Sequence, residues 1–142
     1  METKTNFITV SEPPEQYQAG VTSLKTGIYS RSGKTTIFLQ QPDFFQGDEV
    51  VISAQVDDST NGTHVSNAVV EIRITGPEPR TLTSGPSNTN GIAEARWKTS
   101  APRRKNSGTT PGSYTATVNN VTASGYTWDG IPTKTPLTVN SK

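Results

Sequence analysis

The sequence predicts an all-β protein built as an antiparallel sandwich, and three observations support this. Segments in which apolar and polar residues alternate recur along the chain, and this period of two is typical of strands with one buried face. Turn residues, mainly Gly, Pro and Asn, separate these segments. Apolar residues nowhere keep the spacing of an amphipathic helix. Short strands between such turns favour a sandwich or a barrel.

The length predicts one domain, because the chain has 142 residues and a seven-stranded sandwich needs roughly 100. Residues 1–20 are polar and contain Pro13-Pro14, which indicates an N-terminal arm or linker. We therefore predict a β-sandwich over residues 21–142.

The charge balance excludes several classes of function. The chain has 13 basic and 12 acidic residues, a net charge of +1, so no global field attracts nucleic acid or an anionic membrane. There is no cysteine, which excludes disulfides, thiolate metal sites and a thiol nucleophile. No segment is apolar enough to predict a membrane span. The first residues lack an apolar signal region, so we expect an intracellular protein or a piece of a larger secreted chain.

The strands are expected in the following order. Two strands, 21–29 and 35–39, flank a turn at 31–34, and a loop follows at 42–48. The clearest alternation lies in 49–56 and 65–75, with Pro77 ending the second segment. The remaining expected strands are 81–83, 92–99, 112–122, a short strand or loop at 126–130, and an edge strand at 135–140.

The strand that follows the turn Thr110-Pro111-Gly112 organises the prediction. Tyr114, Ala116 and Val118 point to one side of it, which we take to be the core. A tyrosine at this place in a sandwich forms a tyrosine corner, in which the hydroxyl bonds to upstream backbone. The predicted core positions are Val50, Ile52, Val56, Val70, Ile72, Ile74, Trp97, Tyr114, Ala116, Val118, Leu137 and Val139.

Several motifs resemble one known class of domain. They are Val65-Ser66-Asn67-Ala68, Asn90-Gly91-Ile92-Ala93 and Gly112-Ser113-Tyr114, each at the start of a strand. Over residues 45–140 the chain resembles the bacterial immunoglobulin-like modules, akin to fibronectin III domains, found in secreted hydrolases and surface adhesins. The resemblance implies an immunoglobulin-like sandwich of about seven to nine strands with Greek-key connections. It also implies a non-catalytic accessory, spacer or binding role.

The loop after the first strong strand is a candidate calcium site. Asp57, Asp58 and Asn61 offer oxygen ligands close together, as hard cations require. Asp48, Glu49 or Asp129 are candidate helpers if the loops cluster. The alternative is a polar hairpin loop whose Asp and Asn side chains bond their own backbone. No other cofactor is expected.

Four aromatic residues are candidates for ligand binding. Tyr126, Trp128, Phe44 and Phe45 lie in predicted loops, and flat exposed rings can stack on sugars. The alternative is that Tyr126 and Trp128 cap one end of the core. His64 is the only histidine and there is no cysteine to join it in a metal site, and no Gly-x-Ser-x-Gly pattern is present, so neither a metal site nor a catalytic triad is expected. The basic run Arg103-Arg104-Lys105 has no neighbouring aromatics and predicts a solvated loop.

The resemblance implies a non-catalytic extracellular module that acts as a spacer or binding domain of a larger secreted or surface protein. Its expected partners are neighbouring domains, a polysaccharide or a cell-surface protein, and neither nucleic acid nor a membrane span. One alternative is a carbohydrate-binding module that uses the exposed aromatics. Another is a structural subunit of an extracellular assembly, in which residues 1–20 add a strand to a neighbouring copy.

Overall fold

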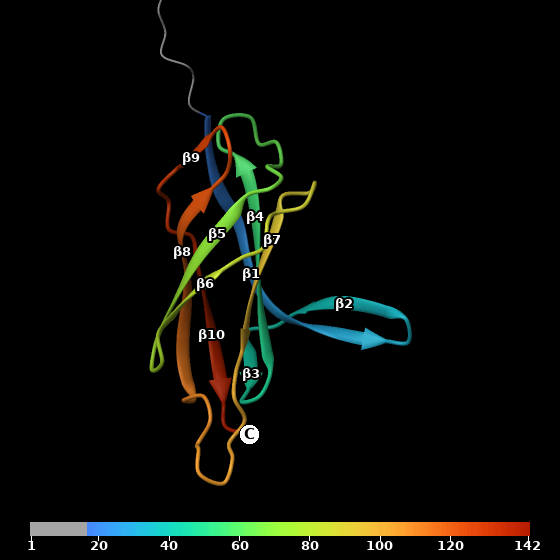
Figure 1. Ribbon diagram of the computed structural model, residues 1–142, viewed down its shortest axis with the longest axis vertical. Helices are drawn as coiled ribbons and strands as arrows, with labels where there is room; N and C mark the ends of the chain where they lie inside the picture. Colours follow the sequence, from blue (N-terminus) through green and yellow to red (C-terminus); the bar gives the residue numbers. More distant parts are fainter. Residues whose placement is uncertain (1–16) are drawn as a thin grey trace, which may run out of the picture.

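The computed structural model describes residues 17–142 and shows two β-sheets packed face to face (Figure 1). The first sheet contains β1 (Tyr17–Ser32), β2 (Thr35–Gln40), β4 (Glu49–Asp58), β7 (Ile92–Lys98) and β9 (Tyr126–Trp128). The second contains β3 (Asp43–Phe45), β5 (Val69–Thr75), β6 (Arg80–Thr83), β8 (Gly112–Thr122) and β10 (Lys134–Asn140). The all-β prediction is confirmed. No helix among the described residues has the length and apolarity of a membrane span.

The strand order is that of an immunoglobulin-like sandwich. The first sheet runs β2-β1-β4-β7, with β9 beside the start of β1, and the second runs β3-β10-β8-β5-β6. The chain crosses between the sheets from β4 to β5, from β6 to β7 and from β7 to β8, as Greek-key connections do. This confirms the predicted fold class, but residues 17–142 form ten strands and not the expected seven to nine, because the short strands β3 and β9 add to the sheet edges.

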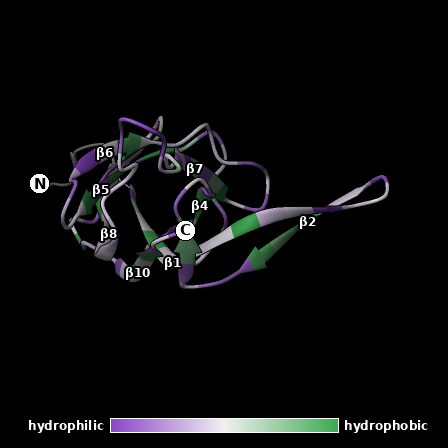
Figure 2. Ribbon diagram, turned by 90° about the horizontal axis from the view of Figure 1, so that it is seen from below, coloured by the Kyte–Doolittle hydropathy of each residue, from purple (hydrophilic) through white to green (hydrophobic). Residues whose placement is uncertain are grey.

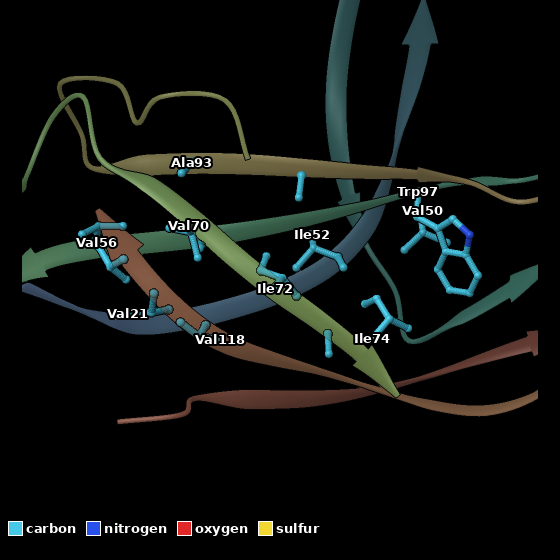
Figure 3. Packing of buried hydrophobic residues seen from close by; sticks show 14 of the residues in the cluster. Val21, Val50, Ile52, Val56, Val70, Ile72, Ile74, Ala93, Trp97 and Val118 are labelled. Atoms are coloured by element: carbon cyan, nitrogen blue, oxygen red, sulfur yellow. The ribbon is translucent and has the colours of Figure 1, made fainter. Parts of the chain in front are cut away.

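The core lies between the two sheets and consists mainly of Val, Ile and Ala side chains (Figure 3). Every predicted core position is buried. Trp97 on β7 packs edge-on against Tyr114 on β8, with ring centroids 5.1 Å apart. The Tyr114 hydroxyl donates a hydrogen bond to the Thr110 carbonyl, so the predicted tyrosine corner is present.

The edge of the second sheet differs from the prediction. Residues 42–48 were expected to be a loop, but Asp43–Phe45 form β3, which pairs with β10 in parallel. Strand β10 was expected at the edge, yet it lies between β8 and β3. The three residues of β3 are too few to show a period of two, so the sequence pattern could not reveal them.

The boundary at residue 20 also changes. Tyr17–Gly20 were assigned to the N-terminal arm, residues 1–20, but they begin β1. There Ala19 pairs with Asp58 and Tyr17 with Tyr126. The other residues of the predicted arm, 1–16, lie outside the described part of the chain.

Strand β1 extends past the sandwich and forms a projecting hairpin with β2 (Figures 1 and 2). We call residues 28–40 the β1–β2 arm. A two-residue turn closes it, because Ser32 pairs with Thr35. Gly33 has a φ of 62° at the first turn position, where type II′ turns favour glycine. The turn predicted at 31–34 is therefore confirmed.

Candidate functional site

The β1–β2 arm carries two of the large apolar side chains that are exposed among residues 17–142, Ile37 and Leu39, while Ile28 at its root packs against the core. Side chains alternate along a strand, and Ile28 pairs with Leu39, so Ile28, Ile37 and Leu39 share one face. Ile37 is 46% exposed and Leu39 is 41% exposed. Figure 2 shows these hydrophobic stretches on the arm, outside the sandwich. An apolar strip on a two-stranded ribbon is typical of a surface that meets a partner.

The other face of the arm is aromatic near its root. Tyr29 pairs with Phe38, and their rings meet edge-on with centroids 5.8 Å apart. The Phe38 ring lies where a side chain on Gly27 would begin, so glycine is required there for β2 to lie close to β1. This packing stiffens the root of the arm.

Polar contacts fix the root to the outer face of the first sheet. The Tyr29 hydroxyl donates a hydrogen bond to Glu94 on β7, and the Arg96 guanidinium lies 4.9 Å from the centre of the Tyr29 ring. Arg96 also pairs with Glu49, with Nη1 and Oε1 3.0 Å apart. The hydrogen bond to Glu94, followed by burial, raises the pKa of Tyr29 above its usual value.

Both long edges of the arm are open. Gly27 is the last residue of β1 that pairs with β4, so residues 28–32 have a partner only on the β2 side. Strand β2 is the terminal strand of its sheet. Residues 35–40 contain neither a charge nor a proline, the usual devices by which edge strands avoid pairing.

The sequence prediction placed these strands but missed their exposure. One signal was available: Ile37-Phe38-Leu39 is a run of three apolar residues, which puts apolar side chains on both faces of one strand. Such a run indicates a strand that is covered on both faces or one that meets a partner.

The four aromatic residues predicted to bind a ligand do not form one surface. Phe44 is fully buried, because β3 turns it into the core, so its assignment to a binding surface is wrong. Phe45 is 55% exposed, but β3 lies at the opposite end of the sandwich from β9, which carries Tyr126 and Trp128 (Figure 1).

At the β9 end, the neighbouring Tyr17 and Tyr126 rings are tilted rather than coplanar. Tyr126 and Trp128 are half-buried and pack against the core, as the alternative interpretation expected. Tyr17, which is 47% exposed, lies beside Tyr126 with ring centroids 6.1 Å apart and planes at 51°. Burial, followed by the charge of Asp58, raises the pKa of Tyr126.

The predicted calcium ligands are engaged in other contacts. The Asp58 carboxylate is buried and accepts hydrogen bonds from the backbone N–H groups of Thr60 and Asn61, at 2.8 and 3.2 Å. The Asn61 side-chain oxygen accepts from the Thr63 N–H at 3.0 Å. This geometry is the polar hairpin loop that the sequence offered as the alternative. Among residues 17–142, no three His, Cys, Asp or Glu side chains gather around a point that could hold a metal.

Asp57 points away from Asp58, since neighbouring residues of a strand face opposite sides. Its carboxylate lies 2.8 Å from the His64 ring nitrogen Nδ1 and accepts the Thr22 hydroxyl at 2.7 Å. Burial raises the pKa of Asp57, but hydrogen bonds from His64, Thr22 and Gln55 outweigh it, and the pKa lies below its usual value. Thr22 bonds to the carboxylate and not to the histidine, so this is not the order of a catalytic triad.

Comparison with known proteins adds a distant likeness only. No known family matches the sequence, and no curated protein matches it. Among solved structures, the chain is similar to the filamin domain of Lin-41, with 20% sequence identity and a TM-score of 0.39, over 70% of this chain and 83% of that one. A likeness of this size says nothing about what the chain binds. The immunoglobulin-like assignment stands on the strand order and the tyrosine corner.

Proposed function

We propose that this protein is a non-catalytic interaction module whose sandwich holds the β1–β2 arm out to a partner. The observation that carries the proposal is the exposed apolar strip on the arm, at Ile37 and Leu39. The arm's root is held by the Tyr29, Phe38 and Arg96 contacts, so the strip is presented by a rigid support. Rigid presentation lowers the entropy lost on binding.

The setting of the module is part of the same proposal. The resemblance to immunoglobulin-like modules favours an extracellular location, as a spacer or adhesion domain of a larger secreted or surface protein. In that setting the sandwich sets the distance between neighbouring domains, and the arm makes the contact.

Carbohydrate binding is a second proposal, favoured by the exposed Tyr17 ring beside Tyr126. It is tested by binding to insoluble polysaccharides, with Tyr17→Ala compared against the wild type. Loss of retention in Tyr17→Ala supports it. Equal retention of both proteins, or no retention, contradicts it.

The arm proposal is tested by photo-crosslinking in the cell that makes the protein. A photoreactive amino acid is placed at Ile37, and a control is placed at Thr83, an exposed position on β6. We expect one discrete product from Ile37 and none from Thr83. No product from Ile37, or the same products from both positions, would contradict a binding role for the arm.

A further inference from the structure

We propose that the partner of the β1–β2 arm is a second copy of this chain, bound by antiparallel pairing of the two β2 strands. This proposal rests on the β1–β2 arm being a binding surface, as argued above, and identifies the molecule that binds to it. A twofold axis would pass through Phe38, so that Phe38 lies opposite the same residue of the second copy.

The backbone fixes which groups are free to pair. The turn joins the Ser32 carbonyl to the Thr35 N–H, so residues 35, 37 and 39 of β2 face β1. The Gln41 N–H continues this alternation by donating to the Thr26 carbonyl at 2.9 Å. The N–H and C=O groups of Thr36, Phe38 and Gln40 therefore point outward, along the open edge.

Pairing about Phe38 uses all these groups. Thr36 of one copy lies opposite position 40 of the other, and Phe38 lies opposite its own equivalent. Each of these pairs exchanges two N–H···O bonds, as hydrogen-bonded antiparallel pairs do. The contact is self-complementary, which is the requirement for a closed twofold dimer.

The same register brings like faces together. Ile37 lies opposite position 39 of the second copy, so the apolar strip of Ile28, Ile37 and Leu39 continues across the joint. On the other face the two Phe38 rings are neighbours, flanked by the two Tyr29 rings. The joined arms form a four-stranded ribbon in place of two isolated hairpins, which is more stable in water.

Charge favours this arrangement over its alternatives. The arm carries Arg31 and Lys34 near its tip and no acidic residue. Antiparallel pairing places the two basic tips at opposite ends, whereas parallel pairing would bring like charges together. A tip of Arg31-Ser32-Gly33-Lys34 is polar, which disfavours insertion of the arm into a membrane.

The first test is the mass of the full chain, measured by sedimentation velocity over a dilution series from millimolar to low micromolar. We expect a shift from twice 15.2 kDa towards 15.2 kDa on dilution. Thr36→Pro removes an outward N–H from each copy without touching the bonds to β1, and should weaken the dimer by about tenfold or more. Thr36→Val keeps the N–H and should dimerise like the wild type.

The second test is the register, read with thiols in a chain that otherwise has none. Ile37→Cys and Leu39→Cys proteins are mixed and oxidised. In the proposed register these positions are about 4.5 Å apart between Cα atoms, close enough for a disulfide. We expect the mixed disulfide dimer, and little dimer from either protein alone, because like positions lie on the diagonal at about 7–8 Å.

The outcomes separate this inference from the proposed function. A monomer at every concentration, or disulfides equally frequent in all mixtures, overturns the second copy as partner. If the crosslink from Ile37 in cells then reaches a different protein, the arm still binds and only its occupant was wrong. If that crosslink is also absent, both proposals fail.

Discussion

Strand β1 passes through two environments, and the contrast between them shows what burial adds to a strand. From Ala19 to Gly27 it pairs with β4, and Ala19 and Val21 pack into the core. From Ile28 to Ser32 it pairs only with β2; Ile28 still packs against the edge of the core, but Ile37 and Leu39 of that ribbon are exposed. Both halves pair antiparallel with a neighbouring strand. What differs is whether a second sheet covers the face, and that decides whether a side chain stabilises the fold or stays exposed.

The largest expected effect compares the same substitution in the two environments. Ile52→Ala on β4 removes a fully buried side chain and should lower the free energy of unfolding by about 2–5 kcal/mol, because a cavity remains. Ile37→Ala on the arm should change it by about 0.5 kcal/mol or less. Chemical denaturation of both variants, at concentrations below any self-association, measures the difference. A loss at Ile37 as large as that at Ile52 would show that the arm is part of the core.

The next effect lies at the junction between the two halves. A methyl group on Gly27 would collide with the Leu39 carbonyl and the Phe38 ring. We expect Gly27→Ala to lower stability by about 1–3 kcal/mol through this overpacking. Hydrogen exchange should become faster in β2, while β4 and β8 keep their protection. Gly85→Ala is the control, since nothing lies within 4 Å of a Cβ there. If hydrogen exchange in β2 stayed unchanged, the Phe38 ring would not be packed against Gly27.

Two tyrosine hydroxyls give a smaller, pH-dependent comparison. Tyr114→Phe removes the hydrogen bond to the Thr110 carbonyl and should cost about 1 kcal/mol at neutral pH. Tyr29→Phe should cost less, because the Tyr29 bond to Glu94 lies at the partly exposed root of the arm.

Stability at high pH should further distinguish Tyr114→Phe from the wild type. Burial first, and then the charge of Glu78, raises the pKa of Tyr114 above 10.0. A raised folded-state pKa adds stability that is complete below the unfolded-state value and is lost as the pH rises through the folded-state value. Stability should therefore fall above about pH 10, and less steeply in Tyr114→Phe. Denaturation at stepwise higher pH measures this, and equal slopes in the two proteins would contradict it.

The smallest expected effect on stability concerns Thr22, which lies at the β-bulge in the buried half of β1. The register shifts between Val21 and Ser23, and the Thr22 hydroxyl reaches the Asp57 carboxylate. Thr22→Val should cost about 0.5–1 kcal/mol near neutral pH, and Thr35→Val in the arm should cost nothing measurable.

The stability difference between Thr22→Val and the wild type should also depend on pH. The pKa of Asp57 is lowered, so its stabilisation is present above the unfolded-state value and is lost as the pH falls through the folded-state value. The difference between Thr22→Val and the wild type should shrink below about pH 4. A difference that stays constant with pH would show that the hydroxyl does not act through the carboxylate.

Much of the fold could be predicted because alternation and turn chemistry are local. Val50, Ile52 and Val56 share one face whatever lies opposite, and Tyr114 follows its turn wherever the strand is placed. The candidate site could not be predicted in the same way. Tyr126 and Trp128 carry the same aromatic signal as Phe45, but only the packing shows that they press against the core.

By itself the sequence determined most of the strands, the buried faces of the strands in the core and the tyrosine corner, since these follow from residues a few positions apart. Only the tertiary structure decided the partners: β3 beside β10, Phe44 in the core, and the β1–β2 arm clear of the sandwich. Alternation states which side chains share a face, but not whether a distant segment covers that face. Among the described residues no segment covers Ile37 and Leu39, which leaves both side chains exposed.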